Sequence, residues 1–473
     1  MRYKFIVPIV FVFLSSFSFS QEKWTLERCI EYALKNNIQI KQQELNSEYA
    51  KNNLRQSKLN ILPTVNGSAA QNYSWGRSVD RFTNTFSEDR TMSVNFGLSS
   101  SITVFNGFQN YNTVRQKNFD MMAGLQNLEK AKNDISLSIS SSYLQILFNL
   151  EFLEIAKSQL DITKLQVERT KKLVDAGSVA NGNLLQVEAQ AAQEDLQVVN
   201  AENNLTLSYL TLIQLLDIDS VEFFQIDKPD FENFDMSAAL LTADLVYLEA
   251  EKNLPQVRAS EYSLRSAESG LALARGNMSP RLTLSGSYGT GYSDARKSIT
   301  ETIMEEVQMG MLNIAGTDYP INMMQPSYKY ETTPFKDQLK NNVSKALSVN
   351  LTIPIFNGWQ VRTSVSNAKI NVLNAQYQLE GTKKQLLKEI QQASADATAA
   401  VKKFNSSKKA VVSMEEAFNY TQQKFDVGLI NTVDYNTAKN NLVRAKAEML
   451  QAKYEFIFKS KILDFYRGNP IKL

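Results

Sequence analysis

Two long stretches of the chain, residues 108–176 and 359–427, contain no proline and only one glycine each. Apolar residues recur through the first stretch at helical spacing, with steps of seven residues such as Leu128 to Ile135. At about 1.5 Å per residue, a helix of this length reaches roughly 100 Å and requires lateral partners, as in a coiled coil. The sequence therefore predicts two long, laterally packed helices. Their remaining polar residues either line water or form an ordinary solvated face.

Each long stretch ends at a glycine, Gly177 in VDAGS or Gly428 in FDVGL. Glycine tolerates the left-handed backbone conformation found at helix ends. A second helical pattern follows each glycine, over 183–216 and 434–466, so we predict two antiparallel helical hairpins. The turns are either buried between domains or free tips. The length of the helices favours free tips, where small apolar residues form an exposed patch.

The two halves of the chain repeat each other. VFNGFQ at 104–109 returns as IFNGWQ at 355–360, an offset of 251 that the glycine turns share. Upstream, ALKNNIQIK at 33–41 aligns with AEKNLPQVR at 250–258, an offset of 217. The two offsets differ by 34, which places an insertion in the second half within 293–342. Two copies are too few for a solenoid, so duplication of one supersecondary unit fits best.

The residues before each FNG phrase alternate between apolar and polar, which predicts strands. With their weaker upstream partners, four strands in two hairpins are expected at about 64–75, 91–105, 281–292 and 343–356. The pattern fits either the edge of a soluble β-sandwich or strands that cross a bilayer. The polar positions are Ser, Thr, Asn and Gly rather than charged residues, which favours the bilayer. Four strands cannot close a barrel, so several copies would have to share one.

The N-terminal residues 1–20 read as a secretory signal peptide, because basic residues precede a short apolar stretch and small residues follow it. The remaining chain is expected to divide into four parts. These are a first repeat at 21–216, an inter-repeat segment at 217–245, a second repeat at 246–466 and a tail at 467–473.

Composition argues against an enzyme. The sequence has no histidine and a single cysteine, Cys29, which excludes imidazole-based catalysis, zinc sites built on several cysteines and an internal disulfide. A small buried residue on a helix is the expected role of Cys29. A formal net charge of +2 indicates no nucleic-acid partner. We expect no catalytic residue, no cofactor and no metal site.

Five methionines lie in the insertion: Met304, Met309, Met311, Met323 and Met324. A thioether copper site is conceivable. Their irregular spacing favours an ordinary surface loop or lid.

The chain resembles the TolC-like outer-membrane efflux proteins over essentially its whole mature length. The most specific segment is KFDVGLINTVDYNTAKNNLVRAKAEMLQAKYEF at 424–456, supported by WTLERCIEYALKNN at 24–37 and by the duplicated plan. The resemblance implies a mainly α-helical fold with a membrane β part. Three copies would form one twelve-stranded β-barrel in the outer-membrane lipid of a Gram-negative bacterium, continuous with a periplasmic α-helical barrel.

The resemblance also implies a passive export channel. Such a channel docks a periplasmic adaptor (a membrane fusion protein) and an inner-membrane pump of the RND, ABC or MFS type, in efflux or type I secretion. Drugs, small molecules or secreted proteins would pass through it. The alternative is a soluble periplasmic coiled-coil scaffold or adaptor, which has no use for an apolar strand face repeated in the same register.

Three sets of site residues follow. The resemblance implies adaptor-docking tips at Ala176, Gly177, Ser178, Val427, Gly428 and Leu429. It implies a pore constriction at Asp434, its first-half counterpart Asn183, and Thr437, which replaces a second aspartate; one carboxylate per chain would attract cations there. The residues themselves indicate strand-to-helix joints at Phe105, Asn106, Gly107, Phe356, Asn357 and Gly358, because Asn-Gly permits a change of backbone path.

Overall fold

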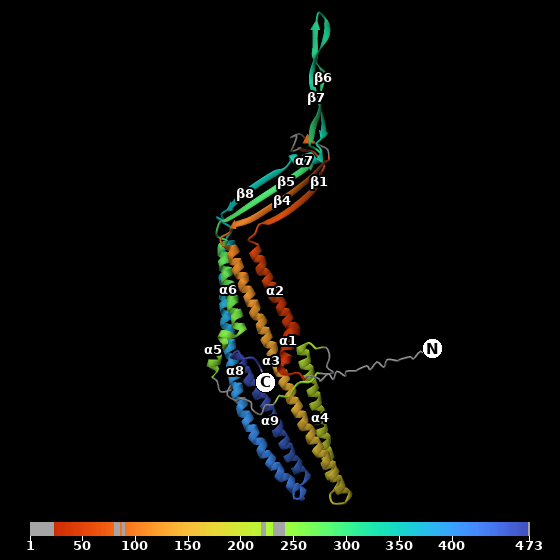
Figure 1. Ribbon diagram of the computed structural model, residues 1–473, viewed down its shortest axis with the longest axis vertical. Coiled ribbons are helices and arrows are strands. Elements are labelled where there is room, and N and C mark those ends of the chain that lie inside the picture. Colours follow the sequence, from red (N-terminus) through yellow and green to blue (C-terminus); the bar gives the residue numbers. More distant parts are fainter. Residues whose placement is uncertain (1–22, 80–85, 88–89, 219–223, 230–241, 472–473) are drawn as a thin grey trace, which may run out of the picture. The chain divides into compact units, whose positions relative to one another are not determined.

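A computed structural model describes residues 23–79, 86–87, 90–218, 224–229 and 242–471 (Figure 1). The predicted signal peptide and much of the inter-repeat segment lie outside these residues. The described chain is mainly helical, with strands in one four-stranded and two two-stranded antiparallel sheets. No helix among these residues combines the length and the apolar character needed to cross a membrane.

The chain divides into two units. The first comprises residues 1–51, 119–265 and 373–473, and its described part is helical apart from one isolated β-bridge. The second comprises residues 52–118 and 266–372 and holds the strands.

The helices repeat with the two offsets found in the sequence. At an offset of 217, α1 (Leu26–Asn36) and α2 (Ile38–Leu59) correspond residue for residue to α5 (Ala243–Asn253) and α6 (Pro255–Gly276). At an offset of 251, α3 (Gln109–Asp175) corresponds to α8 (Gln360–Asp426), and each has 67 residues. The return helices are α4 (Asn181–Leu216) and α9 (Thr432–Tyr466), which begin two residues before the predicted positions. The duplication of a helical unit is confirmed.

One sheet joins strands from both halves. It contains β1 (Thr64–Ser74), β4 (Thr91–Phe105), β5 (Arg281–Ser293) and β8 (Ser344–Thr352), in the order β1-β4-β5-β8. All three ladders are antiparallel. The last strand was predicted over 343–356 but ends at Thr352, shortly before Pro354, which has no N–H to donate to a ladder. A short ribbon of β2 (Ser78–Val79) and β3 (Phe86–Ser87) lies between β1 and β4 in the sequence.

The insertion is not the ordinary surface loop or lid that the sequence suggested. It folds into a long antiparallel hairpin of β6 (Lys297–Ile314) and β7 (Thr317–Thr332), followed by α7 (Phe335–Asn341). Two register shifts, between Ile299 and Glu301 and between Gln308 and Gly310, interrupt the ladder. These shifts break the period of two on which recognition of a strand from sequence depends.

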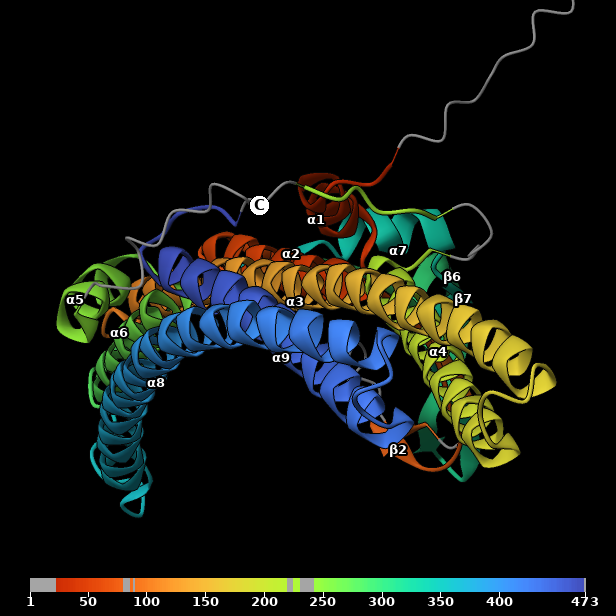
Figure 2. The same ribbon diagram turned by 90° about the horizontal axis from the view of Figure 1, so that it is seen from below.

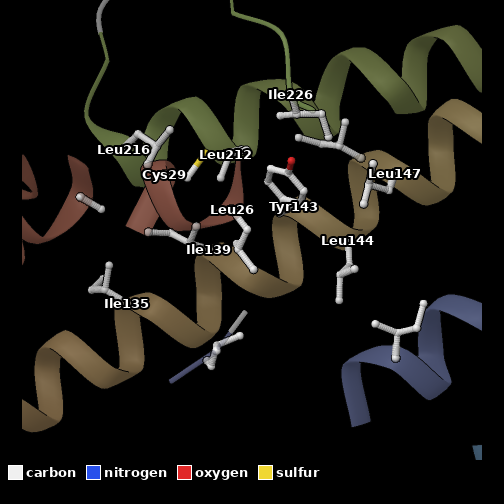
Figure 3. Close-up of a cluster of buried hydrophobic side chains, with 14 of the residues drawn as sticks. Leu26, Cys29, Ile135, Ile139, Tyr143, Leu144, Leu147, Leu212, Leu216 and Ile226 are labelled. Atoms are coloured by element: carbon white, nitrogen blue, oxygen red, sulfur yellow. The ribbon is translucent and has the colours of Figure 1, made fainter. Parts of the chain in front are cut away.

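The main core of the helical unit forms where α1, α3 and α4 meet (Figure 3). Tyr143 is fully buried there, and its hydroxyl donates to the carbonyl oxygens of Trp24 at 3.0 Å and Asp227 at 2.7 Å. These bonds fasten the bridge between Trp24 and Ile226 to α3. Cys29 is fully buried on α1, as predicted, and this burial raises the pKa of its thiol to about 12.

Candidate functional site: helical turns, joints and a two-faced sheet

The turn between α3 and α4 is closed by the two hydrogen bonds of a Schellman motif. Gly177 has φ +69° and its N–H donates to the Val174 oxygen at 2.9 Å. The next N–H, of Ser178, donates to the Leu173 oxygen at 2.8 Å. Ala176, Gly177 and Ser178 are all exposed, and a Cβ on this glycine would meet nothing within 4 Å. Glycine is therefore needed for the backbone conformation and not for close packing.

The turn between α8 and α9 closes a second helical hairpin (Figures 1 and 2) and repeats the hydrogen bonds of the first turn. Gly428 has φ +78° and its N–H donates to the Phe425 oxygen at 3.0 Å, while Leu429 N–H donates to the Lys424 oxygen at 2.8 Å. The side chains on either side of the glycine are apolar and strongly exposed, Val427 at 71% and Leu429 at 74%. Exposure of both turns favours free tips over buried interdomain turns.

Contacts that the sequence did not indicate hold the second turn in place. The ring of Tyr435 on α9 is buried against Phe425 and Phe418, with ring centroids 4.5 and 5.5 Å apart. Arg169 on α3 forms an ion pair with Asp426, the last residue of α8. The ion pair joins residues 257 positions apart and the aromatic rings lie on two different helices, so no local pattern reveals these contacts.

The three predicted constriction residues lie near the start of the return helices. Asp434 is exposed in the first turn of α9, and its N–H donates to the side-chain oxygen of the N-cap residue Asn431 at 2.9 Å. Its carboxylate is favourably placed at a helix N-terminus. Thr437 is exposed one turn later, and its hydroxyl donates to the Val433 oxygen at 2.8 Å. Asn183 is half-buried in the first turn of α4.

A buried ion pair fastens α9 to the first hairpin. Lys439 on α9 and Glu194 on α4 are each 3% exposed, with Nζ 3.3 Å from Oε1. The ammonium also donates to the Gln159 carbonyl at 3.2 Å and to the Thr163 hydroxyl, both on α3. Gln190 donates to the carboxylate at 2.8 Å. Burial lowers the pKa of Lys439, and the neighbouring carboxylate opposes this effect.

Both FNG phrases lie between a strand and a long helix, and both turn the chain in the same way. Gly107 and Phe108 have φ values of 64° and 61°, and Gly358 and Trp359 have values of 60° and 65°. Each joint therefore contains two consecutive left-handed residues, of which only the glycine avoids a steric penalty.

The surroundings of the two joints differ. Phe105 ends β4, and the side chain of Asn106 donates to Asn110 at 2.9 Å in the first turn of α3. A Cβ on Gly107 would lie 2.5 Å from the backbone oxygen of Gly276 at the end of α6. In the second half, Phe356 and Asn357 are exposed between β8 and α8, and a Cβ on Gly358 would meet nothing within 4 Å of the chain.

The four-stranded sheet has one apolar and one polar face. The ladders place the predicted apolar positions within the four strands on one face, with one exception. Val104 was expected on this face, but the register shift between Thr103 and Phe105 puts Phe105 there instead. The positions are Val65, Ala69, Tyr73, Met92, Val94, Phe96, Leu98, Ile102, Leu282, Leu284, Tyr288, Tyr292, Leu347, Val349 and Leu351. The other face carries Ser, Thr, Asn, Ala and Gly, with Arg281 at the start of β5. Polar residues interrupt the apolar face, among them Gln71 opposite Val94 and Lys345 opposite Tyr288. In the described chain, β1 and β8 each have one edge without a partner strand.

A metal centre finds no support in the described part of the chain. No group of three or more His, Cys, Asp or Glu side chains there is arranged to hold an ion. The β6–β7 ladder places Met323 on the face opposite Met304 and Met324. The five methionines of the insertion therefore do not converge on one thioether site.

A sequence profile described as outer membrane efflux protein matches residues 29–217 and 246–460. Outer membrane protein TolC of Escherichia coli (strain K12) is 24% identical over 464 residues, covering 96% of this chain and 84% of that protein. The outer membrane channel CmeC of Campylobacter jejuni has a TM-score of 0.75 at 18% identity, covering 94% of this chain and 85% of that one. The outer membrane protein VceC of Vibrio cholerae gives 0.72 at 17% identity, covering 94% and 96%.

Proposed function

The chain belongs to the outer membrane efflux protein family, and from this premise we propose that three copies form a passive export duct. As a member of this family the protein is an outer-membrane transport channel of Gram-negative bacteria and not an enzyme. One observation carries the proposal: a two-faced sheet with many exposed apolar side chains, whose two outer edges have no partner strand among the described residues.

A sheet of this kind is completed by other copies of itself. Unpaired backbone groups are too costly in lipid, so the β8 edge of one copy would pair with the β1 edge of the next. Three copies would give twelve strands, the number that the family resemblance implies. The apolar face would contact lipid and the Ser, Thr and Asn face would line a water-filled interior. The alternative, a soluble periplasmic scaffold or adaptor, gives the exposed apolar face no role.

The helical hairpins would lie in the periplasm. Their exposed turns would dock a periplasmic adaptor, which connects the duct to an inner-membrane RND, ABC or MFS pump. Val427 and Leu429 offer the adaptor an apolar contact, since both are held outward by the Schellman turn at Gly428. Drugs, small molecules or secreted proteins would be the cargo.

The constriction would lie near these turns, where the return helices begin. Three copies of Asp434, each exposed, would form a ring of carboxylates that attracts cations. Asn183 and Thr437 would contribute uncharged polar groups to the same region, so the ring would carry one carboxylate per chain.

A matched pair of lysine substitutions tests the two-faced sheet. Val349→Lys would put a charge on the lipid face, at a cost of about 2–4 kcal/mol near the bilayer centre, whereas Ser348→Lys would point into the aqueous interior. We expect the first variant to lower the yield of trimer in the outer-membrane fraction and the second to leave it unchanged. A soluble monomer, or equal effects of the two substitutions, would refute the barrel.

A further inference from the structure

The base of the β6–β7 hairpin is firmly attached to the four-stranded sheet. Gln338 on α7 is fully buried, and its amide donates to the carbonyl oxygens of Ser293 and Thr333 at 2.8 Å each. Its own oxygen accepts the Ser293 N–H at 3.0 Å. The carboxylate of Asp294 accepts the N–H of Met92 on β4 at 2.8 Å. The hairpin therefore starts from a fixed platform.

Beyond this platform the two strands have no other support within the described residues. β6 and β7 pair with each other, and neither packs against another helix or strand there (Figure 1). An isolated two-stranded hairpin is at best marginally stable in water. A hairpin of this length needs a further packing surface.

The outer part of the hairpin, from Val307 through the turn to Met324, is apolar on one face. Paired residues share a face, and the ladder pairs Val307 with Met323 and Leu312 with Tyr319. The apolar stripe consists of Val307, Leu312, Ile314, Tyr319, Ile321 and Met323, which are 40–55% exposed. The opposite face carries Gln308, Asn313, Asp318 and Asn322, together with Met311, Pro320 and Met324.

The stripe depends on the bulge at Met309. Side chains alternate along a strand, so Val307 and Leu312, five positions apart, would lie on opposite faces of a regular strand. The register shift between Gln308 and Gly310 inserts one extra residue. This extra residue returns Leu312 and Ile314 to the face of Val307. The ladder is thus built to keep one apolar face in an exposed hairpin.

We propose that this stripe packs against the same stripe of neighbouring copies, so that three hairpins form a bundle beyond the shared barrel. The inference rests on the proposed trimer. Pairing of the β8 and β1 edges brings copies together around one axis, and each hairpin leaves its copy at the same end of the common sheet, directly after β5. The hairpin bundle therefore continues the interface made by the sheet edges.

The distribution of charged residues on the hairpin favours a second copy of the chain as the partner of the apolar stripe. Identical surfaces that meet around an axis repel each other if they carry like charges. Asp318 is the only charged residue from 307 to 324, and it lies on the polar face. The charged residues of the hairpin concentrate near its base: Lys297, Glu301, Glu305, Glu306, Lys329 and Glu331. Lipid is a poor partner, because the outer edges of β6 and β7 have no partner strand in the described part of the chain and so present unpaired backbone groups.

Cysteine cross-linking tests the bundle. Ile321→Cys lies on the stripe, and Asn322→Cys lies on the opposite face one residue away, which makes it a matched control. Both are made in the full-length chain with Cys29→Ala and treated with a short bismaleimide in outer membranes. We expect covalent dimers from Ile321→Cys and none from Asn322→Cys. Equal products from both, or none from Ile321→Cys in an intact trimer, would overturn the bundle.

Charge insertion gives a second measurement. Ile321→Glu would place three like charges in the bundle, and we expect the detergent-extracted trimer to dissociate at a lower temperature; Asn322→Glu should not change it. Unchanged dissociation of the Ile321→Glu trimer would count against the bundle. The native mass of the unmodified protein separates the two proposals. A monomer overturns both the duct and the bundle, whereas a trimer without stripe cross-links overturns only the bundle.

Discussion

Removing the ammonium of Lys439 should destabilise the helical unit far more than removing an exposed lysine. The Lys439–Glu194 pair is almost completely buried, and the ammonium has three partners. Breaking a buried pair by deleting one partner costs about 3–5 kcal/mol, because a buried charge is left uncompensated. Gln190 at 2.8 Å and Gln159 at 3.4 Å still donate to the carboxylate after Lys439→Met. We therefore expect Lys439→Met to destabilise the helical unit by about 3 kcal/mol, the lower end of the range.

Deleting both charges should cost much less than the single change. A buried ion pair replaced by apolar residues is often neutral or stabilising. In the double variant Lys439→Met with Glu194→Leu, the Thr163 hydroxyl keeps its bond to the Gln159 oxygen at 3.1 Å. We expect a double-mutant coupling of about 2–3 kcal/mol, at the upper end of the range for residues in one network.

The rate of unfolding in detergent at a fixed guanidinium concentration, followed by loss of helical circular dichroism, measures these effects. Since 1.36 kcal/mol corresponds to tenfold in rate, Lys439→Met should unfold about 100-fold faster if the pair is absent from the transition state. Lys157→Met is the control, because Lys157 on α3 pairs at 2.7 Å with Glu202, which lies on the same helix α4 as Glu194, and both side chains are about half exposed. An exposed pair contributes about 0–1 kcal/mol. Two results would refute the reasoning. One is equal acceleration of unfolding by both lysine substitutions; the other is a double variant whose acceleration equals the product of those of Lys439→Met and Glu194→Leu alone.

Four further outcomes are expected. Leu429→Asp should abolish export while trimer formation and membrane insertion persist; unchanged export would remove this turn from docking. Asp434→Ala should reduce cation preference in planar-bilayer recordings, and an unaltered preference would exclude the carboxylate from the filter. Gly107→Ala should lower the trimer dissociation temperature more than Gly358→Ala, because both pay about 1–2 kcal/mol for a left-handed residue but only the first meets backbone, at 2.5 Å. Asp396 accepts a hydrogen bond from Lys459 on α9 at 2.7 Å, and this bond is the main reason that the pKa of Asp396 is lowered. The ionised carboxylate therefore stabilises the fold above about pH 3.9, and this contribution is lost as pH falls through the folded pKa. Asp396→Asn should flatten that part of the pH–stability curve.

Features that depend on local pattern could be predicted from the sequence. The long helices were found because proline is absent and apolar residues keep helical spacing, and the sheet faces were found because strands alternate with period two. The start of α9 was placed two residues late although its cap was readable. Asn431 is a favoured N-cap residue, and its side chain does accept the Asp434 N–H.

Features that depend on tertiary contact could not be predicted. Lys439 and Glu194 are 245 positions apart, and nothing in either segment marks a buried charge. Phe108 and Trp359 adopt left-handed conformations that non-glycine residues rarely take, so the residue after each FNG glycine was expected to begin an ordinary helix. The inserted hairpin was missed because its two bulges remove the alternation that identifies a strand.

The duplicated halves share a backbone plan and differ in the chemistry of their turns. Both glycines close the same Schellman motif, yet the first is flanked by Ala176 and Ser178 and the second by Val427 and Leu429. The predicted constriction positions also differ, since only the second half carries a carboxylate there. In a trimer the six turns would therefore alternate between two kinds. An adaptor that seeks apolar contact would bind chiefly at the α8–α9 turns, so substitutions there should impair export more than the equivalent substitutions in the α3–α4 turns.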